Sequence, residues 1–209
     1  DSQGYHTQVK ELNEADLQDG DVLIKVLYST INYKDALAIS GKAPVVRRFP
    51  MIPGIDLVGV VEQCDNSKFV VGQHVLLNGY GVGEKYLGGL SQKARINSEF
   101  LIPLPKSITP FNAMAIGTAG YTAMLSVMAL EKQGITPESG SILVTGATGG
   151  VGSFAIRILA ELGYSITAST GSTKQAAYLK QLGANEIIDR AELSAPGKPL
   201  MKERWAAAI

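Results

Sequence analysis

Cysteine and histidine are scarce in this sequence: its 209 residues include one cysteine, Cys64, and two histidines, His6 and His74. A single cysteine excludes a disulfide within the chain and is typical of a reducing compartment, which predicts a cytoplasmic protein. Structural zinc needs three or four converging ligands. Because neither histidine has clustered partner ligands along the chain, we expect no metal site.

Net charge and long apolar runs are also lacking. The 19 basic and 19 acidic residues balance, and the pI is near 6.9. This balance gives no indication of a nucleic-acid or membrane partner and leaves a small molecule as the expected ligand. No uninterrupted apolar run approaches the roughly 18 residues of a membrane span. No signal peptide is apparent at the start, and the first residue is not methionine, so we expect the natural start to be missing.

A glycine-rich turn is the most informative feature that is present. A β-branched run, 141–145, enters the turn, and a segment with helical apolar spacing, 151–162, leaves it. Further runs at 164–170 and 187–188, with a helical pattern at 173–182 between them, give the order β-α-β-α-β. This context favours a dinucleotide pyrophosphate at the helix N-terminus, although a turn that binds nothing is the alternative. The predicted cofactor-binding residues of the turn are Ala147, Thr148, Gly149, Gly150, Val151 and Gly152.

The end of the second predicted strand bears on which dinucleotide is bound. NAD-binding folds place Asp or Glu about 20 residues past the glycines. This chain has no acidic residue between Glu161 and Glu186 and instead offers Thr170, Ser172 and Lys174. Hydroxyl groups and a lysine suit a 2′-phosphate, which a carboxylate would repel. We therefore predict NADPH as the cofactor, the alternative being that Lys174 is an ordinary solvated lysine.

The first half of the chain has a different pattern. Short apolar or alternating runs at 22–27, 55–61, 75–77 and 91–96 follow turn residues, which predicts a small β-rich barrel or sandwich with a short helix over 32–39. From Pro110 the pattern becomes helical, over 111–116 and 122–130. We predict an α/β plus β fold, with a β-rich catalytic domain at 1–110 and a nucleotide-binding domain at 111–209.

Five pieces of the chain match a known superfamily in order: 32–35, 53–59, 88–91, 117–123 and 146–152. On these pieces the chain resembles the medium-chain dehydrogenase/reductase superfamily, and most closely its quinone oxidoreductase-like branch, which includes the acrylyl-CoA reductases. The resemblance implies a GroES-like first domain and a Rossmann second domain. Because the nucleotide-binding domain stops short of the family pattern, we expect the chain to be truncated at both ends.

The resemblance also implies a reaction and its residues. Zinc-dependent relatives carry Gly-His-Glu where this chain has Gly54-Ile55-Asp56, so a zinc-independent hydride transfer from NADPH to an activated C=C bond is implied. Asn32 would lie beside the nicotinamide and donate a hydrogen bond to the developing oxyanion. Its alternative is a helix N-cap with Asp35 at the third helical position.

The remaining candidates follow from the same resemblance. Tyr33 is a donor or proton source, or else a packed aromatic residue. Asp56 lies in an apolar run and needs a partner, and orienting a neighbouring donor is its expected role. Thr118 and Thr122 face the nicotinamide, or else cap and pack a helix. Lys34 and Asp35 are expected to pair on the surface.

Three functions remain open at this point. The first is an NADPH-dependent reductase, of acrylyl-CoA (an enoyl thioester) or alternatively of a quinone. The second is a nucleotide-binding sensor without turnover, and the third is a catalytically inactive fragment. Polar groups at the nicotinamide end favour an enzyme over a sensor. We expect a homodimer for the full protein.

Overall fold

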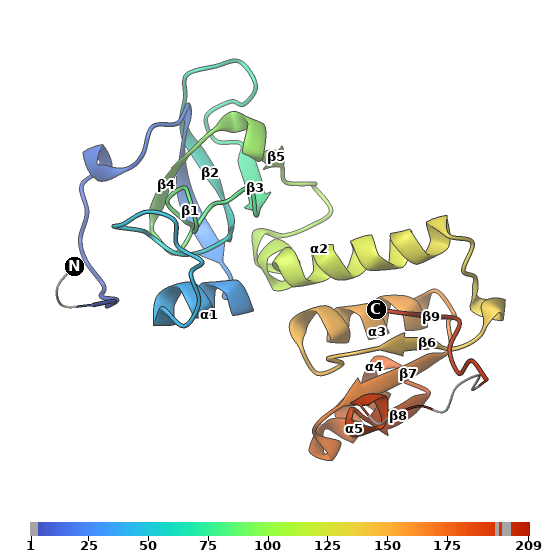
Figure 1. Cartoon of the computed structure of the whole chain (residues 1–209). Coiled ribbons are helices and arrows are strands. Elements are labelled where there is room, and N and C mark those ends of the chain that lie inside the picture. The colour runs from blue at the N-terminus through green and yellow to red at the C-terminus, as the bar shows by residue number, and fades with distance from the viewer. Residues whose placement is uncertain (1–3, 195–196, 198–201) are drawn as a thin grey trace. The chain divides into compact units, whose positions relative to one another are not determined.

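The computed structural model describes residues 4–194, 197 and 202–209 and divides into two compact units, Asp1–Thr118 and Ala119–Ile209 (Figure 1). The first unit contains an antiparallel sheet of five strands in the order β4-β1-β2-β3-β5. Its elements are β1 (Val22–Ser29), α1 (Tyr33–Ser40), β2 (Asp56–Cys64), β3 (His74–Asn78), β4 (Lys93–Ile96) and β5 (Ile102–Pro103).

The core of the first unit forms from the inward-facing residues of these strands. Alternation along β3, where Val75 and Leu77 are buried between more exposed neighbours, shows the period of two that the sequence predicts. The β2 strand is buried almost continuously over its first half because it lies in the centre of the sheet. The principal buried apolar residues are Val22, Ile24, Leu57, Val61, Phe69, Val75, Leu77, Val82, Ala94, Ile96 and Leu101.

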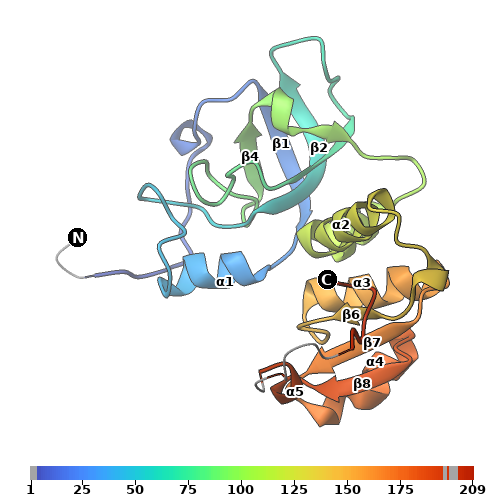
Figure 2. The ribbon, with the colours of Figure 1, turned by 45° about the vertical axis from the view of Figure 1, so that its right-hand side comes forward.

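The second unit is a parallel sheet with helices packed against it (Figures 1 and 2). The strand order is β8-β7-β6-β9, so the chain moves outward through three strands and then returns to the other side of β6. The α3 residues Ala155, Ile156 and Leu159 and the α4 residue Leu179 are fully buried in its core. The elements are β6 (Ile142–Val144), α3 (Gly150–Glu161), β7 (Ile166–Thr170), α4 (Ala176–Leu182), β8 (Glu186–Asp189), α5 (Ala191–Ser194) and β9 (Ala207–Ala208).

The strand β9 adds a fourth strand to the three that the sequence predicts for this sheet, at 141–145, 164–170 and 187–188. Ala207 and Ala208 pair in parallel with Ile142 and Leu143 of β6. The run is too short and too uniform to show a period, and its partner strand lies more than 60 residues away, so no local signal marks it. With β9 in place, the order reverses beside β6, and ligands of open α/β sheets bind at such reversals, outside the carboxyl ends of the strands.

One long helical segment, α2 (Pro110–Lys132), belongs to both units. By length and composition alone this segment is long and apolar enough to cross a membrane, which corrects the expectation that no apolar run approaches the length of a membrane span. The segment is interrupted at Gly117, where φ is 48° and ψ is −159°, so it consists of two shorter helices, as the patterns at 111–116 and 122–130 predict. Each has a buried contact: Ala113 and Met114 pack on Val58 in the first unit, and Ala123 joins the core of the second.

Candidate functional site

The most unusual group in the first unit is the carboxylate of Asp56, which is completely buried at the start of β2 and precedes the apolar run 57–61. Its Oδ2 atom accepts hydrogen bonds from Asn32 Nδ2 at 2.8 Å and from the Thr118 backbone N–H at 2.9 Å. Its Oδ1 atom accepts from Asn78 Nδ2 at 2.9 Å and from the Thr118 hydroxyl at 2.5 Å. Burying a carboxylate is costly unless its lone pairs are satisfied, and these four donors satisfy it.

Each member of this Asp56 cluster (Asn32, Asp56, Asn78 and Thr118) is placed by a different element. Asp56 begins β2 and pairs in register with Asn78, the last residue of β3. Asn32 is the N-cap of α1. Thr118 follows the break in α2 at Gly117. The structure thus brings together two predicted catalytic residues, Asn32 and Asp56, and one predicted cofactor residue, Thr118.

The glycine before Thr118 is required by this arrangement. Gly117 adopts a positive φ of 48°, which is unfavourable for residues with a side chain. A Cβ atom there would also lie 3.0 Å from Asp56 Oδ2 and 3.0 Å from the Thr30 methyl group. The break it creates leaves the Thr118 N–H at the start of a new helix, where first-turn N–H groups lack intrahelical partners. The carboxylate therefore lies at a helix N-terminus, whose partial positive charge stabilises it.

A second carboxylate, Asp35, supports the cluster and corrects the expectation that it pairs with Lys34 on the surface. Asp35 is 1% exposed, and its Oδ1 accepts from the backbone N–H groups of Gly54 and Ile55 at 3.1 and 3.0 Å. Its Oδ2 accepts from the Asn32 N–H at 2.8 Å, in the capping position that the sequence predicts. Asp35 thus fixes both α1 and the segment that enters β2, while Lys34 pairs with Glu84 at 2.5 Å.

Two predicted residues lie apart from these contacts. The Tyr33 side chain is 81% exposed, so the alternative of a packed aromatic residue is wrong. Thr122 lies one turn beyond Thr118 on α2, is half-buried, and its carbonyl accepts from Ser126. Asn78 was not among the predicted residues, because its role depends on the pairing of β3 with β2 and no local motif marks it.

The glycine turn of the second unit opens onto a pocket of about 360 Å³. Among the predicted residues, Thr148 and Thr170 line it, and Gly149 is the N-cap of α3. Gly152 lets helix and strand approach: a Cβ there would lie 2.5 Å from the Gly146 carbonyl oxygen. The lining residues are Thr145, Gly146, Thr148, Ser169, Thr170, Gly171, Arg190, Leu193 and Ser194.

The cation of this pocket is Arg190, which the sequence analysis missed. Its backbone N–H donates to the Thr170 carbonyl at 3.0 Å, and a Cβ on Gly171 would lie 2.7 Å from its Nε. Lys174, the predicted cation, is exposed and does not line the pocket. The signal that could have found Arg190 is topological: in a parallel sheet, the residue after β8 meets the residue after β7 at the same edge.

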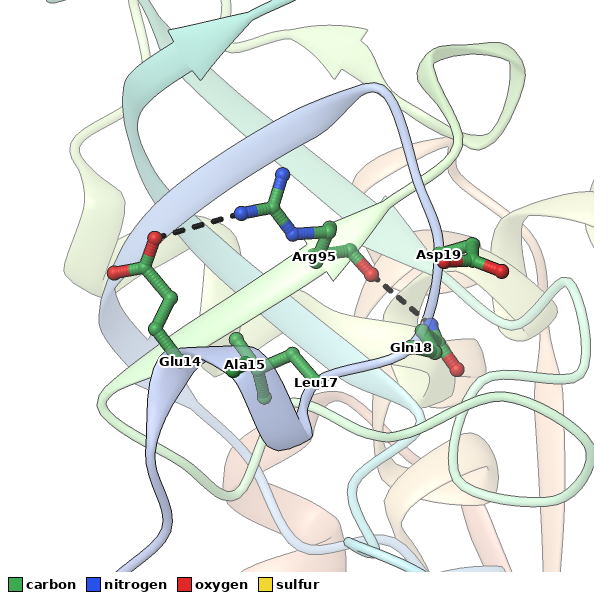
Figure 3. Close-up of a pocket in the computed structure, with 6 residues that line it drawn as sticks. All are labelled: Glu14, Ala15, Leu17, Gln18, Asp19 and Arg95. Carbon is green, nitrogen blue, oxygen red and sulfur yellow. Dashed lines mark hydrogen bonds and ion pairs between the residues drawn. The ribbon is translucent and has the colours of Figure 1, made fainter.

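A second hollow, of about 390 Å³, lies beside β4 in the first unit (Figure 3). Two of its polar side chains are already engaged by the protein, since Arg95 contacts Glu14 at 3.4 Å. Gln18 donates to the Arg95 carbonyl at 3.0 Å and accepts from the Leu87 N–H at 2.6 Å.

No cluster of three or more His, Cys, Asp or Glu side chains suited to a metal ion occurs within the described part of the chain. His74 begins β3 and is exposed. The Cys64 thiol contacts the Asn66 carbonyl at 3.3 Å. The position that carries histidine in zinc-dependent relatives is Ile55, which is buried.

Residues 18–106 match the alcohol dehydrogenase GroES-like domain. Acrylyl-CoA reductase AcuI of Ruegeria pomeroyi is 49% identical over 202 residues, which are 96% of this chain and 61% of that protein. The YhdH oxidoreductase of Salmonella enterica, solved in complex with NADP, is 51% identical with a TM-score of 0.93, over 96% of this chain and 62% of that one. Bacillus subtilis YhfP, solved with NAD bound, is 46% identical with a TM-score of 0.91, over 97% and 62%. This chain therefore spans about three fifths of the length of these proteins.

Proposed function

We propose that this chain is part of an NADPH-dependent oxidoreductase of the zinc-independent branch of the medium-chain dehydrogenase/reductase superfamily. Its match to the GroES-like domain over residues 18–106 and its relatives at 49 to 51% identity support this proposal. The reaction is hydride transfer to an activated C=C bond, and acrylyl-CoA is the proposed acceptor. The names of the relatives at 49 and 50% identity, both acrylyl-CoA reductases, support this choice of acceptor.

The observation that carries the proposal is the pocket at the glycine turn. Helix α3 begins two residues after Thr148, which lines this pocket, and the first-turn N–H groups of a helix are free to bind an anion. A Cβ atom on Gly152 would lie 2.5 Å from the Gly146 carbonyl oxygen, so glycine is needed for the close packing of helix and turn. Arg190 supplies a cation beside Thr170 and Gly171, where a 2′-phosphate would lie. None of the lining residues that the structure describes is acidic. This chemistry fits NADPH better than NADH.

In this proposal residues 1–110 are the catalytic domain, and residues 111–209 are the domain that binds the nucleotide. Bound NADPH supplies the hydride, which adds to the β-carbon of the acceptor, and a proton adds to the α-carbon. Tyr33, exposed beside the cluster in sequence, is the residue we assign to the developing oxygen charge or to the proton. Asp56 and Asp35 hold Asn32 in place.

A quinone reductase is the second candidate. The relative YhfP, 46% identical, bears the provisional name of a quinone oxidoreductase. Exposed apolar side chains adjoin the cluster in sequence, namely Ile31 and Tyr33 on either side of Asn32, and such surfaces suit a flat ring.

A cytoplasmic homodimer completes the proposal. A single cysteine fits a reducing compartment, and an open parallel sheet offers an edge at which two copies could pair.

The experiment is NADPH oxidation, followed by absorbance, with acryloyl-CoA and separately with a simple quinone, both in EDTA. Oxidation with acryloyl-CoA that EDTA leaves unchanged is the expected result. Oxidation with the quinone alone would replace the first candidate by the second. Binding of NADPH without oxidation of either acceptor would contradict both enzymatic candidates and favour a nucleotide-binding sensor.

A further inference from the structure

The dipeptide Asn78-Gly79, at the end of β3, carries the most reactive asparagine of the chain. Deamidation begins when the backbone nitrogen of the following residue attacks the side-chain carbon of the asparagine. A following glycine hinders this attack least, because it has no side chain. Of the chain's seven asparagines, only Asn78 precedes glycine. The sequence therefore marks this position as the first to deamidate once its backbone is free to move.

The structure leaves this dipeptide within reach of water. Asn78 and Gly79 are half-buried, and Tyr80 is exposed. A Cβ atom on Gly79 would meet no described atom within 4 Å, so this side of the backbone is open. Gly79, Tyr80, Gly81 and Gly83 all have positive φ. Glycine loses more conformational freedom on folding than any other residue, which favours local opening of this turn.

Two hydrogen bonds hold the reacting groups in place while the turn is closed. The Gly79 N–H donates to the Ile55 carbonyl at 2.8 Å. The Asn78 Nδ2 donates to Asp56 Oδ1 at 2.9 Å, and the two residues are partners in the register of β3 on β2. The Gly79 nitrogen has to give up its proton before it can attack, so this end of the strand pair has to open first.

We propose that Asn78 is a site of spontaneous deamidation, which the pairing of β3 with β2 suppresses and local opening permits. The Gly79 nitrogen forms a bond to Asn78 Cγ, the Cγ–Nδ2 bond breaks, and the proton from Gly79 leaves with Nδ2 as ammonia. Water then opens the cyclic imide. Addition at the side-chain carbon gives aspartate, and addition at the backbone carbon gives isoaspartate. The net reaction consumes one water and releases one ammonia, without an oxidant or a reductant.

Deamidation at this position opens the Asp56 cluster. The product carries a carboxylate where the Asn78 Nδ2 donated to Asp56 Oδ1 at 2.9 Å. Carboxylates only accept hydrogen bonds, and Asp56 is completely buried, so two like charges would meet with no donor between them. Isoaspartate also inserts an extra carbon into the backbone and disturbs the register with β2. The strand pair cannot close as before, and the change is irreversible. This inference does not depend on which ligand the protein binds.

Peptide mass spectrometry tests the proposal, by following the conversion of each asparagine during incubation of the whole chain in mildly alkaline buffer. In guanidinium chloride, Asn78 should convert faster than the other six. In the folded protein its rate should fall by roughly tenfold or more, because the rate follows the population of the open form. Asp56→Leu should raise the folded-state rate, whereas Asp65→Leu, at an exposed carboxylate, is the matched control and should leave it unchanged. If Asp56→Leu does not fold, the wild-type comparison still decides.

The variant Asn78→Asp tests the consequence, because it has the side chain of one product. It should melt at a lower temperature than wild type. Asn97→Asp is the matched control: Asn97 Oδ1 accepts from the Glu99 N–H at 2.9 Å, which a carboxylate does equally well. Three results would overturn the proposal. They are equal rates at Asn78 in the folded and unfolded protein, faster conversion of another asparagine in guanidinium chloride, and wild-type stability of Asn78→Asp.

Discussion

Replacing Asp56 by leucine removes the acceptor that organises four donors in the first unit. Leucine is similar in size, so the loss of hydrogen bonds dominates over the creation of a cavity. Three of the donors belong to the half-exposed side chains of Asn32, Asn78 and Thr118, and water can replace the carboxylate for them. The Thr118 backbone N–H, held beside the buried strand, is the donor that water replaces least easily.

The expected cost follows from these differences. An unsatisfied buried donor lowers the free energy of unfolding by about 1–3 kcal/mol, and breaking a buried charged network lowers it by about 3–5 kcal/mol. Part of this loss is offset because the variant no longer buries a charge. We expect a loss of about 3 kcal/mol. For a chain of 209 residues each kcal/mol corresponds to about 2–4 °C, so the melting temperature should fall by roughly 6–12 °C.

Asp56→Asn is the informative companion. Its amide oxygen can keep the Thr118 N–H and Asn32, while its NH₂ faces Asn78 and the Thr118 hydroxyl, both of which can rotate to accept. The expected cost is about 1 kcal/mol.

Thermal unfolding followed by circular dichroism measures both variants, and Asp65→Leu is the control. Asp65 is an exposed carboxylate just after β2, and its replacement should change stability by less than about 0.5 kcal/mol. If Asp56→Leu melts within a degree of wild type, or no lower than Asp65→Leu, the carboxylate does not organise the cluster and the reasoning fails.

Three further predictions concern other parts of the chain. Arg190→Met should raise the Kd for NADP⁺ roughly ten- to hundredfold, because a hydrogen bond between a cation and a phosphate is lost, and should leave the Kd for NAD⁺ nearly unchanged. Both dissociation constants are measured by titration, with Arg157→Met on α3 as the control. Equal effects on the two nucleotides would contradict the role of Arg190. Gly152→Ala should abolish NADP⁺ binding and lower stability by about 1–3 kcal/mol, since its methyl group would lie 2.5 Å from backbone oxygen of the turn; wild-type affinity would show that the turn is not the site. Burial raises the pKa of Asp21, but hydrogen bonds from a hydroxyl and a backbone N–H outweigh it, and the pKa lies below its ordinary value. The ionised Asp21 carboxylate stabilises the fold fully above its unfolded pKa of about 3.9, and this contribution is lost as pH falls through the folded pKa. Asp21→Asn should therefore lower the melting temperature at pH 7 but not at pH 2. A lower melting temperature of the variant at pH 2 as well would contradict this role of the carboxylate.

Features set by neighbouring residues could be predicted from the sequence. The cap of α1 was predictable because Asn32, Asp35 and Gly41 lie at the spacing that begins and ends a helix. The glycine turn was predictable because strand, turn and helix follow one another directly. Gly163, with a φ of 84°, ends α3 as expected.

Features set by pairing between distant segments could not be predicted in this way. Asn78 joins Asp56 only through the register of β3 on β2, and Arg190 reaches the pocket only because β8 lies beside β7. Asp35 was expected on the surface because its charge and its neighbour Lys34 gave no sign of burial. Its buried partners are backbone N–H groups 19 and 20 residues away, which no side-chain pattern reveals.

The break in α2 shows how a local feature, the glycine at residue 117, determines a contact between distant segments. An unbroken helix through residue 117 would commit the Thr118 N–H to a carbonyl four residues earlier, and Asp56 would lose this backbone donor. With Gly117 at positive φ, the second helix begins at the carboxylate, and its partial positive charge offsets the burial of a negative one. The same carboxylate can then fix the orientation of two amides and a hydroxyl. One glycine thus permits a buried charge, and the buried charge fixes the side chains of Asn32, Asn78 and Thr118.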